Sequence, residues 1–224
     1  MLENPQEPRE YDAVLGGENP PPIDGAVLGG IEGVKLRLAS KVVEVRIAAL
    51  REALNYANAG LDLVIEALDD ESTLLKDAAV DLLSDKEEVK AKFALLAYQL
   101  KLEPNNGYIY NKRALLRQEL GDLEGAIADF SEAVSRLEYK AAEILYNRGV
   151  CRQKLGDFQG AIDDYDITIL RNSTNVNAYL NRGICWQSLK KYQKAKDNYL
   201  QVVFYKEDSV FVYYNLGVCA YNLK

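Results

Sequence analysis

The fold is decided by the stretch AEILYNRGVCRQKLGDFQGAIDDYDITILRNSTN, which spans residues 142–175. Its pattern predicts two short helices, over 142–155 and 158–171. Gly156 and Asp157 lie between them. A glycine suits the left-handed end of one helix, and an aspartate suits the cap of the next. The stretch therefore predicts a helix–turn–helix unit.

Equivalent glycines repeat along the chain at a fixed spacing. Gly149 lies 34 residues before Gly183 and 68 residues before Gly217. A constant period of this length is the sequence sign of stacked helix–turn–helix units. We therefore expect an all-α solenoid, with units at about 107–140, 142–175 and 176–209 and a final helix over 210–223.

These units resemble tetratricopeptide repeats at four kinds of position. Small residues let the two helices of a unit approach closely, and a large aromatic fills the gap beside them. The resemblance implies a right-handed superhelix whose first helices line a concave groove. The matching residues are Ala114, Gly149, Gly183 and Gly217 in the first helices, Leu120, Leu155, Leu189 and Leu223 before the turns, Ala126, Ala161 and Ala195 in the second helices, and the aromatics Phe130, Tyr165 and Tyr199.

The units depart from the family pattern, and two of these departures lead to predictions. The third turn has Lys190-Lys191 instead of Gly-Asp, so it loses both the left-handed stop and the N-cap. We therefore expect the third unit to be the least stable. The spacing between the first and second units is 35 residues, which predicts one inserted residue near Lys140.

Residues 1–29 differ in composition from the rest of the chain. They hold five of the six prolines together with several glycines. Both residue types disfavour a helix, so we expect an extended arm. The arm either packs on its own domain or serves as a docking peptide for another protein.

Residues 30–86 form a second zone, in which two segments, 45–54 and 75–84, align at a spacing of 30. This zone resembles the HEAT-like repeats of phycobiliprotein lyases, and the segment before it resembles a leader of cyanobacterial repeat proteins. The resemblance implies a pigment-handling function as an alternative to those below. The expected helices are 31–38, 42–57, 61–68 and 73–83.

A long helix is expected over 87–103, because Pro104 follows it and cannot continue it. Lys92 stands where a tetratricopeptide second helix has a small alanine, so this helix would belong to a degenerate unit. We therefore expect the array to extend over 87–224. The core positions of this helix are Leu96, Leu100 and Leu102.

The composition favours a non-enzymatic binding protein. The net charge of −7 argues against a nucleic-acid binder, whose surface would be basic. The chain has no histidine, which removes Ser–His and Cys–His catalysis and the common zinc sites. It has no apolar run long enough for a membrane span, and its N-terminus lacks the features of a signal peptide. We therefore expect a cytoplasmic protein without a cofactor or metal.

Three groups of residues could indicate a functional site, but their positions favour a structural role. Trp186 is expected in the core. Three cysteines occupy equivalent positions of three units. We therefore expect them to be small core residues and not a metal-binding or redox set: Cys151, Cys185 and Cys219. An acidic cluster lacks the glycine and spacing of a calcium loop and is expected on a solvated helix face: Asp163, Asp164 and Asp166.

The predicted ligand site lies on the first helices of the units. An asparagine recurs at one position of three successive first helices, where its amide can donate to and accept from an extended peptide backbone. Hydrogen bonding between repeats is an equally good explanation of these asparagines. The groove lacks the lysines and arginines with which chaperone-binding members of the family hold a C-terminal carboxylate. Its predicted residues are Tyr108, Asn111, Leu115, Gln118, Tyr146, Asn147, Val150, Gln153, Leu180, Asn181, Ile184, Gln187, Tyr214, Asn215 and Val218.

The predicted function is that of an adaptor or assembly factor, which holds a peptide or helix of another protein in this groove. Arg148 and Arg182 follow the asparagines and are expected to pair with acidic residues of adjacent helices. The last helix, 210–223, is crowded with apolar residues. It indicates either a homo-oligomeric scaffold, held by self-association through this helix, or a sequence cut from a longer chain.

Overall fold

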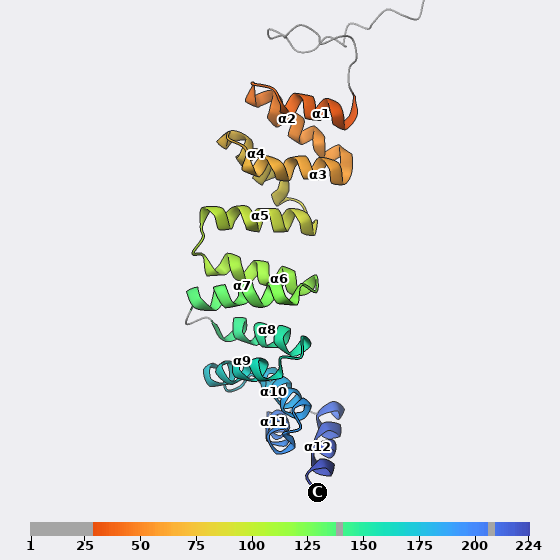
Figure 1. Ribbon diagram of the computed structural model, residues 1–224, viewed down its shortest axis with the longest axis vertical. Coiled ribbons are helices and arrows are strands. Elements are labelled where there is room, and N and C mark those ends of the chain that lie inside the picture. Colours follow the sequence, from red (N-terminus) through yellow and green to blue (C-terminus); the bar gives the residue numbers. More distant parts are fainter. Residues whose placement is uncertain (1–28, 138–140, 206–208) are drawn as a thin grey trace, which may run out of the picture. The chain divides into compact units, whose positions relative to one another are not determined.

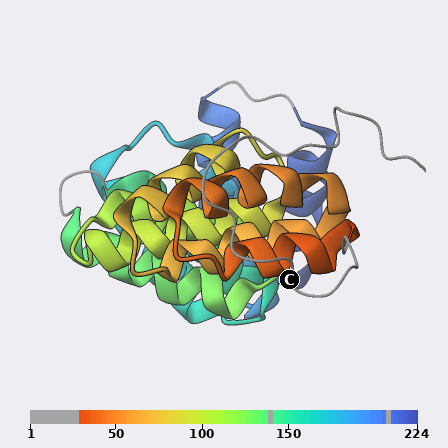
Figure 2. The ribbon, with the colours of Figure 1, turned by 90° about the horizontal axis from the view of Figure 1, so that it is seen from above.

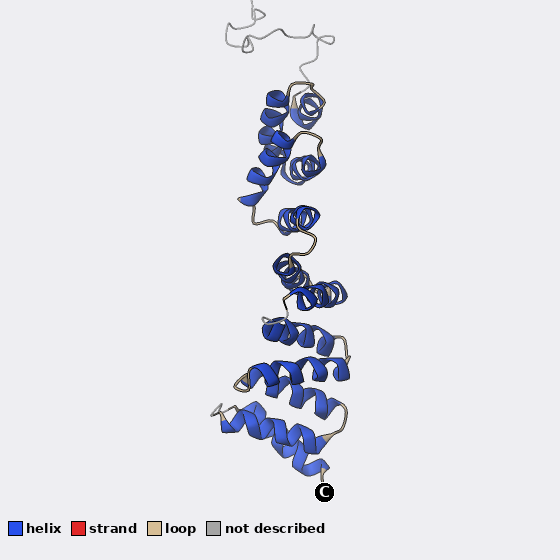
Figure 3. Ribbon diagram, turned by 90° about the vertical axis from the view of Figure 1, so that its left-hand side faces the viewer, coloured by secondary structure: helices blue, strands red, loops and turns tan. Residues whose placement is uncertain are grey.

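The computed structural model describes residues 29–137, 141–205 and 209–224 (Figure 1). Every regular element in these ranges is helical, as Figure 3 shows, so the predicted all-α fold is confirmed. Apart from Gly29, the predicted arm over 1–29 lies outside the described residues, and so does the insertion expected near Lys140. The chain forms two compact units, Met1–Leu63 and Val64–Lys224. The predicted domain limits, 30–86 and 87–224, stay a prediction.

The first compact unit is built on two helices, α1 (Gly30–Leu38) and α2 (Val43–Ala53). Their fully buried residues are Val34, Ala49, Leu50 and Ala53. The helix predicted over 42–57 is interrupted, because a 3-10 turn (Leu54–Tyr56) follows Ala53 and Ala57 has a positive φ of 47°. The helix α3 (Ala57–Glu66) comes next. The HEAT-like character of this zone stays a prediction.

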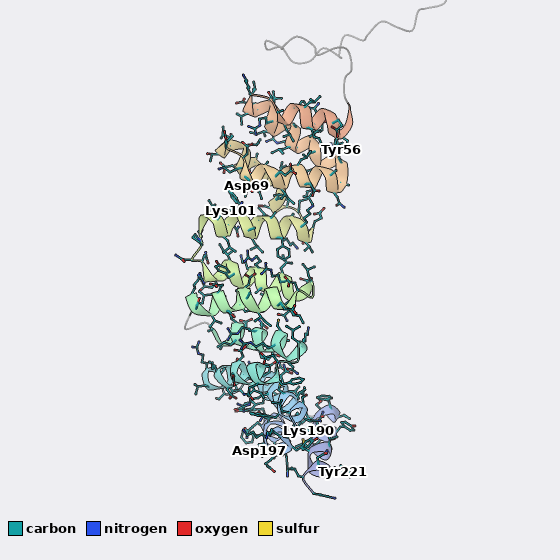
Figure 4. All side chains as sticks on the ribbon, in the orientation of Figure 1. Tyr56, Asp69, Lys101, Lys190, Asp197 and Tyr221 are labelled. Atoms are coloured by element: carbon teal, nitrogen blue, oxygen red, sulfur yellow. The ribbon has the colours of Figure 1, made fainter. Side chains whose placement is uncertain are left out.

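The second compact unit contains α4 (Thr73–Ser84) and α5 (Val89–Leu102) before the repeats. Lys101 of α5 pairs with Asp69 of a short 3-10 helix (Ala67–Asp69), with 2.5 Å between Nζ and Oδ1 (Figure 4). Ala91 is the fully buried residue of α5. The expectation of a core position at Leu102 was wrong: this side chain is 64% exposed. It is the last residue of the helix, where the chain turns away toward Pro104.

The repeats follow as helical hairpins that pack in chain order. Figure 2 looks along this stack, so that successive helices lie one behind another. In each hairpin the second helix contacts its own first helix and the first helix of the next repeat. The first repeat is α6 (Gly107–Glu119) with α7 (Leu123–Arg136), the second is α8 (Ala141–Lys154) with α9 (Phe158–Arg171), the third is α10 (Val176–Ser188) with α11 (Tyr192–Phe204), and α12 (Val210–Asn222) follows.

A tyrosine seated on a glycine joins the two helices of a hairpin. A Cβ built at Gly149 would lie 2.8 Å from Cε1 of Tyr165, and one built at Gly183 would lie 2.8 Å from Cε1 of Tyr199. Both tyrosines are fully buried. Only glycine leaves room for so close an approach, so the sequence assignment of small and aromatic positions is confirmed.

The turns differ between repeats as the sequence predicted. Gly156 has a φ of 83°, and the Asp157 side chain accepts a hydrogen bond of 2.9 Å from the backbone N–H of Gly160. In the third repeat Lys190 occupies the left-handed region with a φ of 58°, and Lys191 makes no side-chain cap. The third hairpin therefore holds the same turn with less favourable residues.

Candidate peptide-binding groove

An arginine–aspartate cluster links the two helices of the second repeat. Arg148 donates from Nη2 to Oδ1 of Asp164 at 2.6 Å and from Nε to Oδ2 at 3.0 Å, and Arg152 donates to Oδ2 at 2.9 Å. The pairing expected for Arg148 is confirmed. The expectation that Asp164 lies on a solvated face was wrong, because it is almost completely buried. Asp163 and Asp166 remain exposed, as expected.

The same arrangement recurs in the first repeat and changes in the third. Arg113 makes two hydrogen bonds of 2.6 and 2.7 Å to the buried carboxylate of Asp129. In the third repeat Arg182 instead donates to Oδ1 of Asn198 at 2.8 Å and to Oδ1 of Asp166 at 2.5 Å. These arginines are therefore engaged inside the repeats and do not supply a cationic groove.

Two predicted groove glutamines hold core tyrosines. Tyr165 donates from its hydroxyl to Oε1 of Gln153 at 2.8 Å, and Tyr199 donates to Oε1 of Gln187 at 2.7 Å. Burial raises the pKa of both tyrosines, so both hydroxyls remain donors at neutral pH. In each glutamine the side-chain oxygen is therefore held by a tyrosine, whereas the amide nitrogen makes no hydrogen bond within the described residues.

The recurring asparagines do not act alike. Asn181 donates to the hydroxyl of Tyr146 in the preceding repeat at 3.1 Å, which is the inter-repeat bond considered above. Asn215 donates to the carbonyl of Phe211 in its own helix at 2.8 Å. Asn147 makes no hydrogen bond among the described residues. The difference follows from the sequence, since only the second repeat offers a tyrosine at the partner position.

Four predicted groove residues come together around one hollow of about 320 Å³ between α10, α11 and α12. They are Ile184, Gln187, Asn215 and Val218. The rest of the wall was not predicted from the sequence and consists of Ser188, Tyr192, Tyr199 and Phe211. Tyr199 was assigned to the core, where it does lie, but its position beside Gly183 could also have placed it at the floor of this hollow.

A second hollow, of about 420 Å³, lies between α5 and α6. Leu115 is the one predicted groove residue in its wall. Charged side chains border this hollow, including that of Lys92. A hydrogen bond of 2.5 Å to Glu87 raises the pKa of Lys92. The α5 wall was not predicted as a ligand surface, although Lys92 in place of an alanine marked this helix as irregular. Its remaining residues are Leu95, Leu96, Gln99, Lys112, Leu116 and Glu119.

The other predicted groove residues have different environments. Tyr108 and Leu115 are exposed on α6, whereas Val150 and Leu180 are half-buried against the cores of their repeats. Tyr214 does not border the hollow between α10 and α12; it faces a separate shallow hollow on α12. In the first repeat, two side-chain oxygens are buried without a hydrogen-bond partner, on Asn111 and Gln118.

The cysteines and Trp186 pack as the sequence predicted. Cys151, Cys185 and Cys219 are buried free thiols, and burial raises the pKa of all three, that of Cys185 to about 12. Trp186 packs between two repeat cores, and Lys194 Nζ lies 4.1 Å from its ring centre. Within the described residues, no group of His, Cys, Asp and Glu side chains could hold a metal ion, and no helix could span a membrane.

Comparison with known proteins supports the repeat assignment. Residues 111–172 match the profile of the Tetratricopeptide repeat family. A crystal structure of MamA is 24% identical, with 64% of this chain and 84% of that chain covered and a TM-score of 0.58. A second MamA structure is 22% identical, with 73% and 82% covered and a TM-score of 0.55. No curated protein sequence matches the chain.

A third structure, the first tetratricopeptide domain of Spaghetti bound to an HSP90 peptide, is 20% identical. The match covers 52% of this chain and 92% of the Spaghetti domain, with a TM-score of 0.49. At these levels of identity the MamA structures establish the fold alone, and the family match identifies tetratricopeptide repeats within residues 111–172.

Proposed function

Starting from the tetratricopeptide repeats of residues 111–172, we propose that this protein is a non-enzymatic adaptor that holds a peptide segment of another protein. The observation that carries the proposal is the hollow between α10, α11 and α12. Its wall brings together four residues that repeat position alone assigned to a groove: Ile184, Gln187, Asn215 and Val218.

The chemistry of the wall favours an apolar anchor. None of its eight residues is charged, and Ile184, Phe211 and Val218 supply apolar surface. A volume of about 320 Å³ accommodates one large aliphatic or aromatic side chain. A terminal carboxylate would find no cation here, so we propose an internal peptide segment as the ligand.

Amide groups beside the anchor would fix the peptide backbone. Gln187 has its oxygen occupied by Tyr199, which leaves its nitrogen to donate to a peptide carbonyl. Gln153 is held in the same way in the preceding repeat, and Asn147 of the same helix has both amide atoms unused among the described residues. The proposed path of the peptide therefore runs along the first helices, from α12 toward α8.

The proposal is tested with peptides selected from a random display library on the whole chain and measured by fluorescence anisotropy. Ser188→Phe would place a ring in the mouth of the hollow from an exposed position. We expect at least about a tenfold loss of affinity, because the apolar anchor is excluded. The matched control is Ser135→Phe, an exposed serine of α7 outside the hollow.

The double variant Asn147→Ala and Asn181→Ala tests the amide path. We expect weaker peptide binding, and Asn147→Ala alone separates binding from the structural bond that Asn181 makes to Tyr146. Unchanged affinity in both Ser188→Phe and Asn147→Ala, with normal unfolding curves, would contradict the groove. The pigment-handling alternative rests on the first zone alone and stays a prediction, which absorbance titration with a bilin would test.

A further inference from the structure

The hollow between α5 and α6 lies where the large aromatic of a repeat is missing. In each repeat a fully buried alanine of the second helix precedes that aromatic by four residues. The pairs are Ala126 and Phe130, Ala161 and Tyr165, and Ala195 and Tyr199. The fully buried alanine of α5 is Ala91, one residue before the position predicted for it, so Leu95 stands in the place of the aromatic. A leucine fills less space than an aromatic ring, and room remains for the hollow of about 420 Å³.

This hollow occupies the same repeat position as the hollow between α10, α11 and α12. Three pairs of equivalent residues border the two hollows: Leu95 and Tyr199, Lys112 and Asn215, and Leu115 and Val218. Their chemistry differs, because the wall at α12 is neutral whereas Lys92, Lys112 and Glu119 border the wall at α5 and α6. The two hollows therefore suit different ligand segments.

The charged side chains of this wall are not equally engaged. Lys92 pairs with Glu87 at 2.5 Å and also interacts electrostatically with Glu119, so its charge is already balanced. Lys112 lies seven residues before Glu119 on α6, about two helical turns away. It is exposed and makes no ion pair among the described residues. Its ammonium group is therefore available to an acidic ligand.

The rest of the wall is mainly apolar and comes from both helices, which follow each other in Figure 1. Its apolar residues are Leu95, Leu96, Leu115 and Leu116. We propose that this hollow binds an acidic segment of another protein, with an apolar side chain on the four leucines and a side-chain carboxylate of Asp or Glu at Lys112. Charge complementarity selects this occupant over the neutral segment proposed for the hollow at α12.

An unpaired oxygen beside the hollow also fits a peptide ligand. Gln118 lies three residues after Leu115, on the same face of α6. Its counterparts Gln153 and Gln187 each accept a hydrogen bond from a tyrosine. The first repeat has Phe130 instead, which carries no hydroxyl, and the side-chain oxygen of Gln118 is buried without a partner. A backbone N–H of the ligand would supply this missing donor once the side chain turns toward it.

The experiment uses the whole chain with Ser188→Phe, which closes the hollow at α12. A random peptide display library is selected on this variant. We expect the recovered sequences to combine an apolar residue with a nearby Asp or Glu. They are then synthesised with an acetylated N-terminus and an amidated C-terminus, so that no terminal carboxylate contributes, and their binding is measured by fluorescence anisotropy.

Lys112 is tested by changing both partners of the proposed ion pair. Replacing the acidic residue of the peptide by its amide should weaken binding about threefold to fivefold, as for an exposed ion pair. Lys112→Asn, which introduces the residue of the other first helices, should abolish this preference. Lys112→Glu should weaken the acidic peptide about tenfold, because like charges then meet. The matched control is Lys41→Glu, which makes the same change at an exposed lysine outside the hollow.

The apolar part of the wall is tested from both helices. Leu95→Phe introduces the aromatic of the first repeat and should lower peptide affinity at least about tenfold, because the ring fills the hollow. Leu115→Ser removes apolar surface from a side chain that is 43% exposed, so it should weaken binding with little effect on the unfolding curve. The second variant keeps the test valid where the added ring disturbs the packing of α5.

Three results would overturn the proposal. They are a Ser188→Phe chain that selects no capped peptide, equal affinities for the acidic peptide and its amide, and binding that survives both Leu95→Phe and Leu115→Ser. The proposal does not depend on the hollow at α12. Loss of binding there in Ser188→Phe tests the proposed adaptor groove, whereas the Lys112 variants leave that wall unchanged.

Discussion

The second and third repeats have the same backbone plan but differ in the polar residues that hold it. Both seat a buried tyrosine on a first-helix glycine, and both fix its hydroxyl with a glutamine. The second repeat adds a buried carboxylate, Asp164, between two arginines. In the third repeat Asn198 replaces the carboxylate and Trp186 replaces one arginine.

The comparison separates two tasks in the repeat. The tyrosine–glycine contact sets how closely the helices approach, and it is retained where the rest has changed. The charged cluster and the turn residues add stability on top of that geometry. The hollow proposed to bind a peptide lies where these additions are missing, between the third repeat and α12.

The largest effect is expected from breaking the buried cluster. Asp164→Ala would leave Arg148 and Arg152 without their buried partner, which should cost about 3–5 kcal/mol of unfolding free energy. Asn198→Ala removes a neutral amide acceptor of the Arg182 guanidinium and should cost about 1–3 kcal/mol. Urea unfolding of both variants measures the difference. Equal costs would mean that the charge adds nothing to the second repeat.

A smaller effect is expected from repairing the third turn. Lys190→Gly removes a non-glycine residue from the left-handed region and should stabilise the chain by about 1 kcal/mol. The matched reverse change is Gly156→Lys, which should destabilise the second turn by a similar amount. Thermal unfolding followed by circular dichroism reports both. A Lys190→Gly chain with an unchanged midpoint would show that the turn carries no strain.

The cap behind that turn should be harder to repair. Asp157→Ala should cost about 1 kcal/mol, because the N–H of Gly160 loses its acceptor. Lys191→Asp should raise the free energy of unfolding by much less than this amount. A Cβ at Gly160 would lie 2.2 Å from Oδ2 of Asp157, and the third repeat has Lys194 at that position. Chemical unfolding of the two variants should therefore give unequal changes; equal changes would contradict a role for the glycine.

These details show how far the sequence could predict the structure. The period, the helices and the glycine–tyrosine contacts followed from residue spacing, because they repeat within the chain. The burial of Asp164 did not, since a carboxylate can be buried only when partners 12 and 16 residues away, Arg152 and Arg148, are placed over it. The hollow at α10–α12 was half predicted. Ile184, Gln187, Asn215 and Val218 lie at first-helix positions that repeat along the chain, whereas the contribution of Phe211 and Tyr192 depends on how α12 packs.

The smallest effect concerns local opening, and the three cysteines report it. Burial raises the pKa of each thiol, so at pH 8 each stays protonated and reacts only when its helix opens. Cys219 lies in the core between the third repeat and α12, whereas Cys151 lies in the core of the first two repeats. We expect Cys219 to react with a thiol reagent first, by a few-fold in rate, as read by mass spectrometry of digested protein. Lys190→Gly should slow Cys219 and leave Cys151 unchanged. Reaction of all three at one rate would mean that the repeats open together, and the weaker polar contacts of the third repeat would then have no local consequence.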